Sequence, residues 1–343
     1  IGEISGNYHL NKQIGNLKLK FNYINLIGFN NFVKGYANFI GNLKVEKNHF
    51  EIIGNGNLNK LSYENYYFEN GDYNISIFDS ILNFQTKLFK LKSNDSIILD
   101  SSLIIFNKNN NNGNFSINLF SQYGKFEIFG NLMLKDTIKS NFNLVFLNSD
   151  TIIKFDECLF ESYKNYNYLK AKNDNIILEM ILDSLNIDLT FISSNFDYSK
   201  LLKAFKIDSI SLNGYFALRV GGDISSPKLF LNLDLNNIQY KKFFFNEITT
   251  SIYYYDKQIN IDYFKIINRN GVIEGNLNLF SILKLNPFSI TIDEGKINGE
   301  ISFNGFPVDI IEPFLFPNIV IDEGYIQGKA EISGSLTSPM FSG

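Results

Sequence analysis

The sequence predicts an all-β protein built on a long, curled antiparallel sheet. Three observations carry this prediction: apolar and polar residues alternate along most of the chain, short motifs recur, and aromatic residues that favour strands are abundant. Of the 343 residues, 34 are Phe, 19 are Tyr and 45% are hydrophobic. At about 10 residues per strand plus a turn, this length accommodates roughly 20 to 25 strands.

The alternation has a period of two, which places successive side chains on opposite faces of a sheet. In residues 296–305, odd-numbered positions are apolar or Gly and even-numbered positions are polar. Residues 17–23, 229–235 and 326–334 alternate in the same way. We therefore expect one face of the sheet to be apolar along nearly the whole chain.

Internal repetition indicates that the sheet is modular. Residues 293–305 align with residues 322–334, and a third, more diverged copy runs from residue 208 to residue 222. We expect residues 1–195 to form a β-groove segment with weaker repeats and residues 196–343 to form the repeat region. Both parts are expected to belong to one continuous structure that is a fragment of a longer chain.

Only two short helices are expected, at about residues 198–206 and 308–316. Asp197 is a suitable N-cap for the first helix. The Asn-rich tract 107–114 is predicted to be a flexible hairpin loop, in which Gly113 supplies the turn. These helices are too short to cover a large sheet.

An apolar sheet face must be hidden by helices, by a second sheet or by curling around something else. Because helices are few, a β-sandwich is the main structural alternative to a curled sheet. Glycines on the apolar side of the pleat favour curling, because a sandwich core would need side chains there. They either only bend the sheet or also leave room for a guest, and they are Gly54, Gly130, Gly275, Gly299 and Gly328.

The composition argues against several classes of site. The net charge of −4 and the pI near 5.4 provide no basic surface for nucleic acid. His9 and His49 are the only histidines and Cys158 is the only cysteine, so we expect no catalytic imidazole, metal site, cofactor or internal disulfide. The acidic pairs at 293–294 and 322–323 are interpreted as turn residues. We expect a protein that is not an enzyme.

The order of elements in residues 196–343 resembles that of the TamB/AsmA-like family of bacterial envelope proteins. Its features are a short apolar helix, an acidic-Gly opening, an alternating Gly-x-apolar strand and a Gly-x-[Leu/Ile]-x-x-Pro tail. Residues 307–320, 322–334 and 334–343 follow this order, and residues 198–229 repeat it. Residues 1–195 share only the alternation and a short Phe-x-Ile-x-Gly-Asn unit.

The resemblance implies a taco-shaped open groove with a hydrophobic interior that carries phospholipid acyl chains. It further implies a periplasmic location and an inner-membrane anchor missing from this chain. The implied role is phospholipid movement from the inner to the outer membrane, support of outer-membrane protein assembly with an outer-membrane β-barrel partner, or both. The main rival is a structural or binding β-protein without lipid cargo, such as a sandwich-type adhesin or surface repeat protein. A polysaccharide-active enzyme is a more distant alternative.

Alternation alone selects the residues that would line such a groove. For any one of them taken singly, an ordinary core residue is the simpler interpretation. The candidates are Leu212, Phe216, Leu218, Leu229, Leu231, Leu233, Leu277, Leu279, Ile297, Ile301, Phe303, Ile326 and Ile332.

Overall fold

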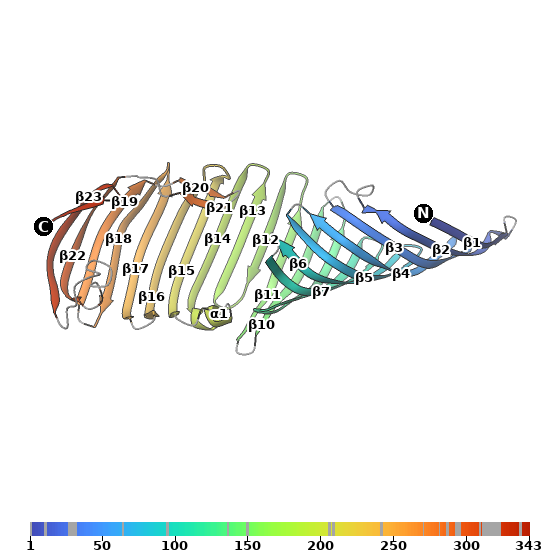
Figure 1. The fold of residues 1–343 in the computed structure, drawn as a ribbon, viewed down its shortest axis with the longest axis horizontal. Coiled ribbons are helices and arrows are strands. Elements are labelled where there is room, and N and C mark those ends of the chain that lie inside the picture. Colours follow the sequence, from blue (N-terminus) through green and yellow to red (C-terminus); the bar gives the residue numbers. More distant parts are fainter. Residues whose placement is uncertain are drawn as a thin grey trace. The chain divides into compact units, whose positions relative to one another are not determined.

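A computed structural model divides the chain into two compact units, unit 1 (Ile1–Ser162) and unit 2 (Tyr163–Gly343). Strands make up most of both units (Figure 1). The structure describes residues 2–9, 12–26, 33–63, 65–93, 96–135, 137–148, 151–204, 207, 210–240, 243–269, 271–280, 282–285, 288–291, 296–308, 310, 324–335 and 338–343.

Unit 1 contains strands β1 to β11, which follow one another along the chain. Their bounds are β1 Gly2–His9, β2 Ile14–Asn25, β3 Val33–Glu46, β4 His49–Tyr63, β5 Tyr66–Phe78, β6 Ile81–Ser93, β7 Ser96–Asn109, β8 Asn112–Ser121, β9 Gly124–Leu134, β10 Ile138–Asn148 and β11 Thr151–Ser162.

Unit 2 contains strands β12 to β24 and the helix α1. Their bounds are β12 Tyr166–Lys172, β13 Ile176–Asp183, β14 Asn186–Asp197, α1 Tyr198–Ala204, β15 Ile210–Asp223, β16 Lys228–Tyr240, β17 Phe243–Tyr255, β18 Gln258–Asn268, β19 Gly271–Phe280, β20 Ile282–Leu285, β21 Phe288–Thr291, β22 Ile297–Pro307, β23 Tyr325–Ser335 and β24 Ser338–Ser342.

Within each unit, strands pair antiparallel with their neighbours along the chain. The exception is the small hairpin β20–β21, which forms its own two-stranded sheet while β19 pairs directly with β22. All other described strands belong to one 22-stranded sheet. The all-β, antiparallel prediction is therefore confirmed, and these strands form a single sheet rather than the two facing sheets of a sandwich.

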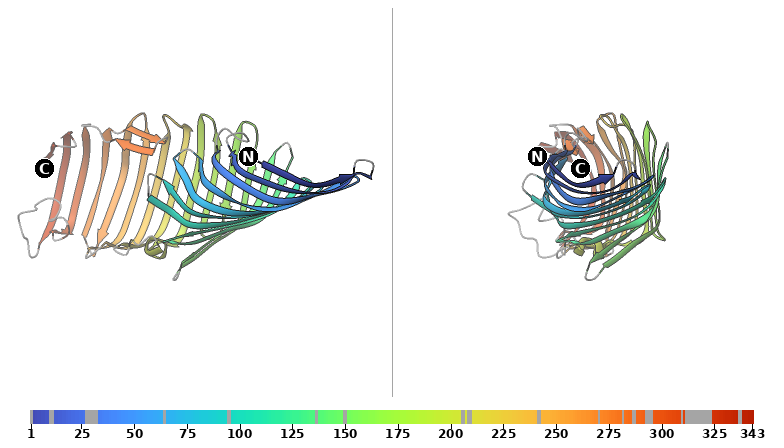
Figure 2. Two further views of the ribbon diagram at one scale, coloured as in Figure 1. Left: turned by 45° about the vertical axis from the view of Figure 1, so that its right-hand side comes forward. Right: turned by 90° about the vertical axis from the view of Figure 1, so that its right-hand side faces the viewer.

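The long strands are bent along their length, most visibly β2 to β7 of unit 1 (Figure 2). Several ladders are interrupted where a residue other than glycine has a positive φ. Tyr23 (φ 57°), Lys60 (φ 51°) and Asn195 (φ 49°) each lie at such an interruption. Extra residues of this kind bend a strand and increase its twist. Alternation predicts the strands but does not reveal these irregularities.

The first predicted helix is confirmed as α1, which begins directly after Asp197. The Asp197 Oδ1 accepts a hydrogen bond of 3.0 Å from the backbone N–H of Ser199, so Asp197 caps the helix as predicted. Val308 and Ile310, at the start of the second predicted helix, are helical, whereas residues 309 and 311–316 lie outside the described residues.

The tract 107–114 forms a hairpin as predicted, but most of it is strand rather than loop, and Gly113 does not supply the turn. Asn107 to Asn109 end β7, residues 112–114 begin β8, and the turn is formed by Asn110 and Asn111. Asn110 takes a φ of 52°, which asparagine tolerates better than most residues, so no glycine is needed there. Gly113 instead opposes Lys108 within the ladder.

Few large side chains are fully buried in this sheet. Phe306 has no exposed surface, and Leu88 and Phe146 are each 4% exposed, but most apolar residues of the strands are only half-buried. Within the described residues, no helix has the length and hydropathy needed to cross a membrane. The fold thus presents broad sheet faces rather than a closed core.

Candidate functional site

The register of unit 2 brings one apolar or glycine residue from each of eleven strands into a single line. Directly opposed residues of an antiparallel pair lie on the same face, so the line follows from the pairing alone. Leu218 opposes Leu231, and Leu231 opposes Ile252. The complete unit 2 apolar row is Ala171, Leu178, Phe191, Leu218, Leu231, Ile252, Ile261, Leu277, Gly299, Ile332 and Phe341.

Two further rows run beside this line on the same face. The first consists of Leu169, Met180, Leu189, Val220, Leu229, Tyr254, Ile259, Leu279 and Ile297. The second consists of Ile176, Ser193, Phe216, Leu233, Thr250, Phe264, Gly275, Ile301 and Ala330. Together the three rows contain no charged side chain.

The register places eleven of the thirteen predicted lining residues on this face. Ile326 opposes Phe306 beyond a ladder irregularity, and Leu212 lies at another irregularity, where its backbone N–H donates 3.2 Å to the Ser199 Oγ of α1. The eleven are Leu218, Leu231, Leu277 and Ile332 in the apolar row, Leu229, Leu279 and Ile297 in the first flanking row, Phe216, Leu233 and Ile301 in the second, and Phe303 opposite Ile273.

These side chains are half-buried, apart from Ile332, which is 7% exposed. The core of a sandwich would bury most of them completely. Neighbouring side chains on the same face cover part of each residue, as where Phe191 and Phe216 meet edge to face with ring centroids 5.5 Å apart. The remaining apolar surface is exposed.

Unit 1 carries an equivalent line that the predicted residues did not include. The prediction concentrated on residues 196–343, where the repeats are clearest, although alternation alone could have located the line. Its members are half-buried for the most part, but Ile4 on the edge strand β1 is 63% exposed. The unit 1 apolar row is Ile4, Leu19, Gly41, Gly54, Ile75, Phe84, Phe106, Phe115, Gly130, Phe142 and Cys158.

Glycines lie on the apolar faces as alternation predicted, and the structure shows what approaches them. A Cβ on Gly54 would stand 2.3 Å from the Phe39 ring, and a Cβ on Gly41 would stand 2.5 Å from the same ring. Gly328 has nothing within 4 Å of its Cβ position. The space beside most of these glycines is thus occupied by neighbouring atoms of the protein, whereas the space beside Gly328 is open.

The opposite face of the sheet is polar. Lys170 opposes Glu179 with 2.7 Å between Nζ and Oε1, and Lys139 opposes Glu161 at 2.9 Å. Such exposed cross-strand ion pairs contribute little stability individually, but they keep this face in water. This face therefore carries charged side chains, which the three apolar rows of unit 2 lack.

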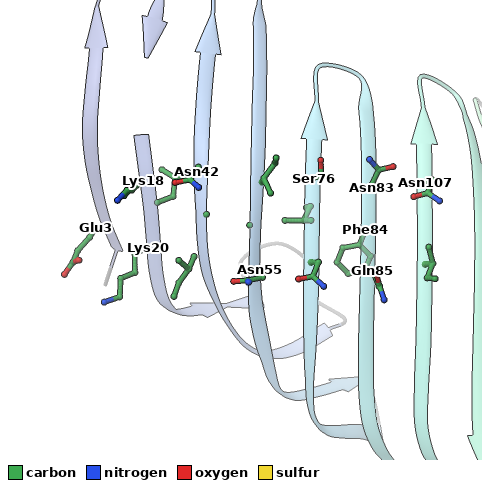
Figure 3. Close-up of a pocket in the computed structure, with 18 of the residues that line it drawn as sticks. Glu3, Lys18, Lys20, Asn42, Asn55, Ser76, Asn83, Phe84, Gln85 and Asn107 are labelled. Carbon is green, nitrogen blue, oxygen red and sulfur yellow. The ribbon is translucent and has the colours of Figure 1, made fainter. Parts of the chain in front are cut away.

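Hollows over the polar face are also present. One of about 810 Å³ lies over β1 to β7, where Asn42, Asn55 and Asn83 are among the lining residues (Figure 3). Another of about 600 Å³ lies over β18 to β24, with Glu274, Asn276 and Glu300 in its lining. Sequence reasoning did not predict these hollows because it treated the polar face only as a solvated surface.

No known family model, curated protein or solved structure matches this chain. The functional argument therefore rests on the residues and on the geometry of the two faces.

Titratable groups stand apart from the apolar rows, with one exception. No group of three His, Cys, Asp or Glu residues in the described part of the chain could hold a metal ion. A hydrogen bond of 2.6 Å from His49 Nδ1 lowers the pKa of Asp79 at an exposed turn. Cys158, in the unit 1 apolar row, is 5% exposed, and burial raises the pKa of its thiol. The apolar rows thus present apolar surface with few titratable groups.

Proposed function

We propose that the chain is a segment of a non-enzymatic lipid conduit, in which acyl chains lie along the apolar face of each unit. The observation that carries the proposal is the unit 2 apolar row, which crosses eleven strands without a polar side chain. At a strand spacing of about 4.8 Å, its ten steps span roughly 48 Å.

Such a row suits a guest that has to move. Burial of apolar surface contributes about 0.8 kcal/mol per methylene group, so a hydrocarbon tail gains stability anywhere along the row. Because neighbouring strands offer similar side chains, a tail can slide from one strand to the next between sites of similar energy. The half-burial of Leu231 and Leu277 leaves surface for this contact.

Among the described residues, little of the chain lies outside the sheet, and this supports the same function. The described elements outside the 22-stranded sheet are α1, which packs next to β15, the hairpin β20–β21, and the helical residues Val308 and Ile310. An apolar sheet face in water needs a cover. Acyl chains provide one that is compatible with an open groove.

With this function we also propose membership of the TamB/AsmA-like family, on the order of elements in residues 196–343. The setting would then be the periplasm, with an inner-membrane anchor outside this chain and an outer-membrane β-barrel protein as partner. The cargo would be phospholipid moving between the two membranes.

Purification without detergent tests the proposal. The protein is expressed in a bacterium, isolated from a detergent-free lysate, and analysed for bound lipid by mass spectrometry. We expect phospholipid to co-purify in a fixed ratio to protein, and a solvatochromic dye to bind after the lipid is removed. A stable protein that carries no lipid and binds no dye would instead indicate a structural β-protein.

A further inference from the structure

The polar face of unit 1 carries a line of side-chain amides. Asn83 opposes Asn107, which opposes Asn114, and the pairing continues through Asn131 to Asn141, so five successive strands each contribute an asparagine. The full line, called the amide row, is Ser5, Lys18, Asn42, Ile53, Ser76, Asn83, Asn107, Asn114, Asn131, Asn141 and Leu159.

Every member of the amide row lines a hollow. The seven row members from Ser5 to Asn107 line the hollow of about 810 Å³. The four row members from Asn114 to Leu159 line a second hollow of about 420 Å³. Figure 3 shows Asn42, Ser76, Asn83 and Asn107 in line across β3, β5, β6 and β7. The two hollows therefore follow the row across the strands.

The five consecutive asparagine side chains are exposed and have no hydrogen-bond partner among the described residues. Each amide provides two N–H donors and a carbonyl acceptor. Asparagines stacked across strands can form a ladder with one another, yet here each one is free to bond a ligand. These five strands thus offer a donor and an acceptor at every step of about 4.8 Å.

The charge of the surface indicates the class of ligand. Lys18 is the only charged member of the row, and the next row along the hollow pairs Glu3 directly with Lys20. In the second hollow, Lys139 and Glu161 form an ion pair of 2.9 Å. A nucleic acid or other polyanion would need many cations here, which the row lacks. Two apolar members, Ile53 and Leu159, provide too little apolar surface for the core of a protein interface.

We propose that the amide row of unit 1 binds a linear, uncharged polysaccharide that runs across the strands. Hydroxyl groups both donate and accept hydrogen bonds, as the amides do, and an extended polymer can repeat the same contacts along the row. The exposed side chains of Ile40 and Ile53 would meet the C–H faces of the sugar rings. This site lies on the face opposite the unit 1 apolar row and does not depend on lipid binding.

Calorimetric titration with cellohexaose, chitohexaose and maltohexaose tests the proposal on the full chain. We expect at least one hexasaccharide to bind. The double variant Asn107→Leu/Asn114→Leu should weaken that binding about tenfold or more, because two amides are lost. The control is Asn260→Leu/Asn278→Leu, which alters a directly opposed asparagine pair of unit 2 outside the described hollows and should leave binding unchanged.

Circular dichroism verifies that each variant keeps its strands, and Asn83→Ala/Asn107→Ala replaces the first variant if it does not fold. The proposal is overturned if none of the three hexasaccharides binds the unaltered protein. It is also overturned if the amide variants bind as tightly as the unaltered chain, or if dextran sulfate binds more tightly than every neutral oligosaccharide.

Discussion

Leu277 on β19 lies directly opposite Gly299 on β22, and its Cδ2 atom stands 2.7 Å from the position that a Cβ on Gly299 would take. The carbonyl oxygen of Asn276 is closer still, at 2.2 Å from that position. The neighbouring strand therefore approaches Gly299 so closely that a larger residue cannot fit without a shift of the backbone.

Replacement of Gly299 by alanine should accordingly destabilise unit 2. We expect Gly299→Ala to lower the free energy of unfolding by roughly 1–3 kcal/mol, since overpacking forces the β19–β22 ladder apart. Urea denaturation followed by circular dichroism measures the change. Ser302→Ala, on the opposite face of the same strand, is the control and should have little effect. Equal stability of the two variants would show that the ladder tolerates a Cβ at this position.

A substitution at Leu233 tests whether the apolar side chains form an open surface or a densely packed core. Because Leu233 is half-buried, Leu233→Asp should cost only about 1–2 kcal/mol of stability while it sharply reduces bound phospholipid. The matched control is Asn232→Asp, which places the same charge on the polar face of β16, where Asn232 accepts a hydrogen bond from Ser251. Complete unfolding of Leu233→Asp would mean that Leu233 belongs to a packed core.

The reactivity of Cys158 reports on how well the unit 1 apolar row is shielded from solvent. Burial raises the pKa of its thiol and shields the sulfur, so the folded protein should react with maleimide at least about tenfold more slowly than the urea-unfolded protein. A cysteine introduced as Glu157→Cys in a Cys158→Ala background faces solvent and should react rapidly. Similar rates at the two positions would argue against the burial of Cys158 in the unit 1 apolar row.

Three turn aspartates should make the protein sensitive to acid. Hydrogen bonds lower the pKa of Asp79 through His49, of Asp183 through the backbone N–H of Leu185, and of Asp223 through Ser225. A lowered folded-state pKa contributes stability that is complete above the unfolded pKa, near 3.9, and is lost as pH falls through the folded value.

The urea concentration at the midpoint of unfolding should therefore decrease as the pH is lowered from about 5 to about 2.5, a range that brackets this titration. In the variant Asp79→Asn/Asp183→Asn/Asp223→Asn this decrease should be smaller, because the amides keep an acceptor oxygen but do not titrate. An identical decrease in both proteins would locate the acid sensitivity elsewhere.

Alternation predicted the face of most of the lining residues, because a period of two leaves only two choices. Leu229, Leu231 and Leu233 lie on one face of β16, and the N-cap role of Asp197 followed from local chemistry alone. Both features depend on short-range rules, which a single sequence contains.

Features that depend on the pairing of residues distant in the sequence could not be predicted from the sequence alone. The ladder irregularity at Leu212 arises from the register of β15 against β16. Strand β19 pairs directly with β22, although the β20–β21 hairpin lies between them in the sequence. The amide row also emerges only once eleven strands are aligned. Tract 107–114 was misjudged because asparagine is common in loops, although here it serves both strand and turn.

Photo-crosslinking at paired positions tests the lipid conduit most directly. A photoreactive residue is placed at Leu277 or Ile301 on the apolar face, and at Asn276 or Glu300, which oppose each other on the polar face. After expression in a bacterium and irradiation, the conduit predicts strong phospholipid labelling at Leu277 and Ile301 and little at Asn276 and Glu300. Equal labelling on both faces, or none on either, would contradict it.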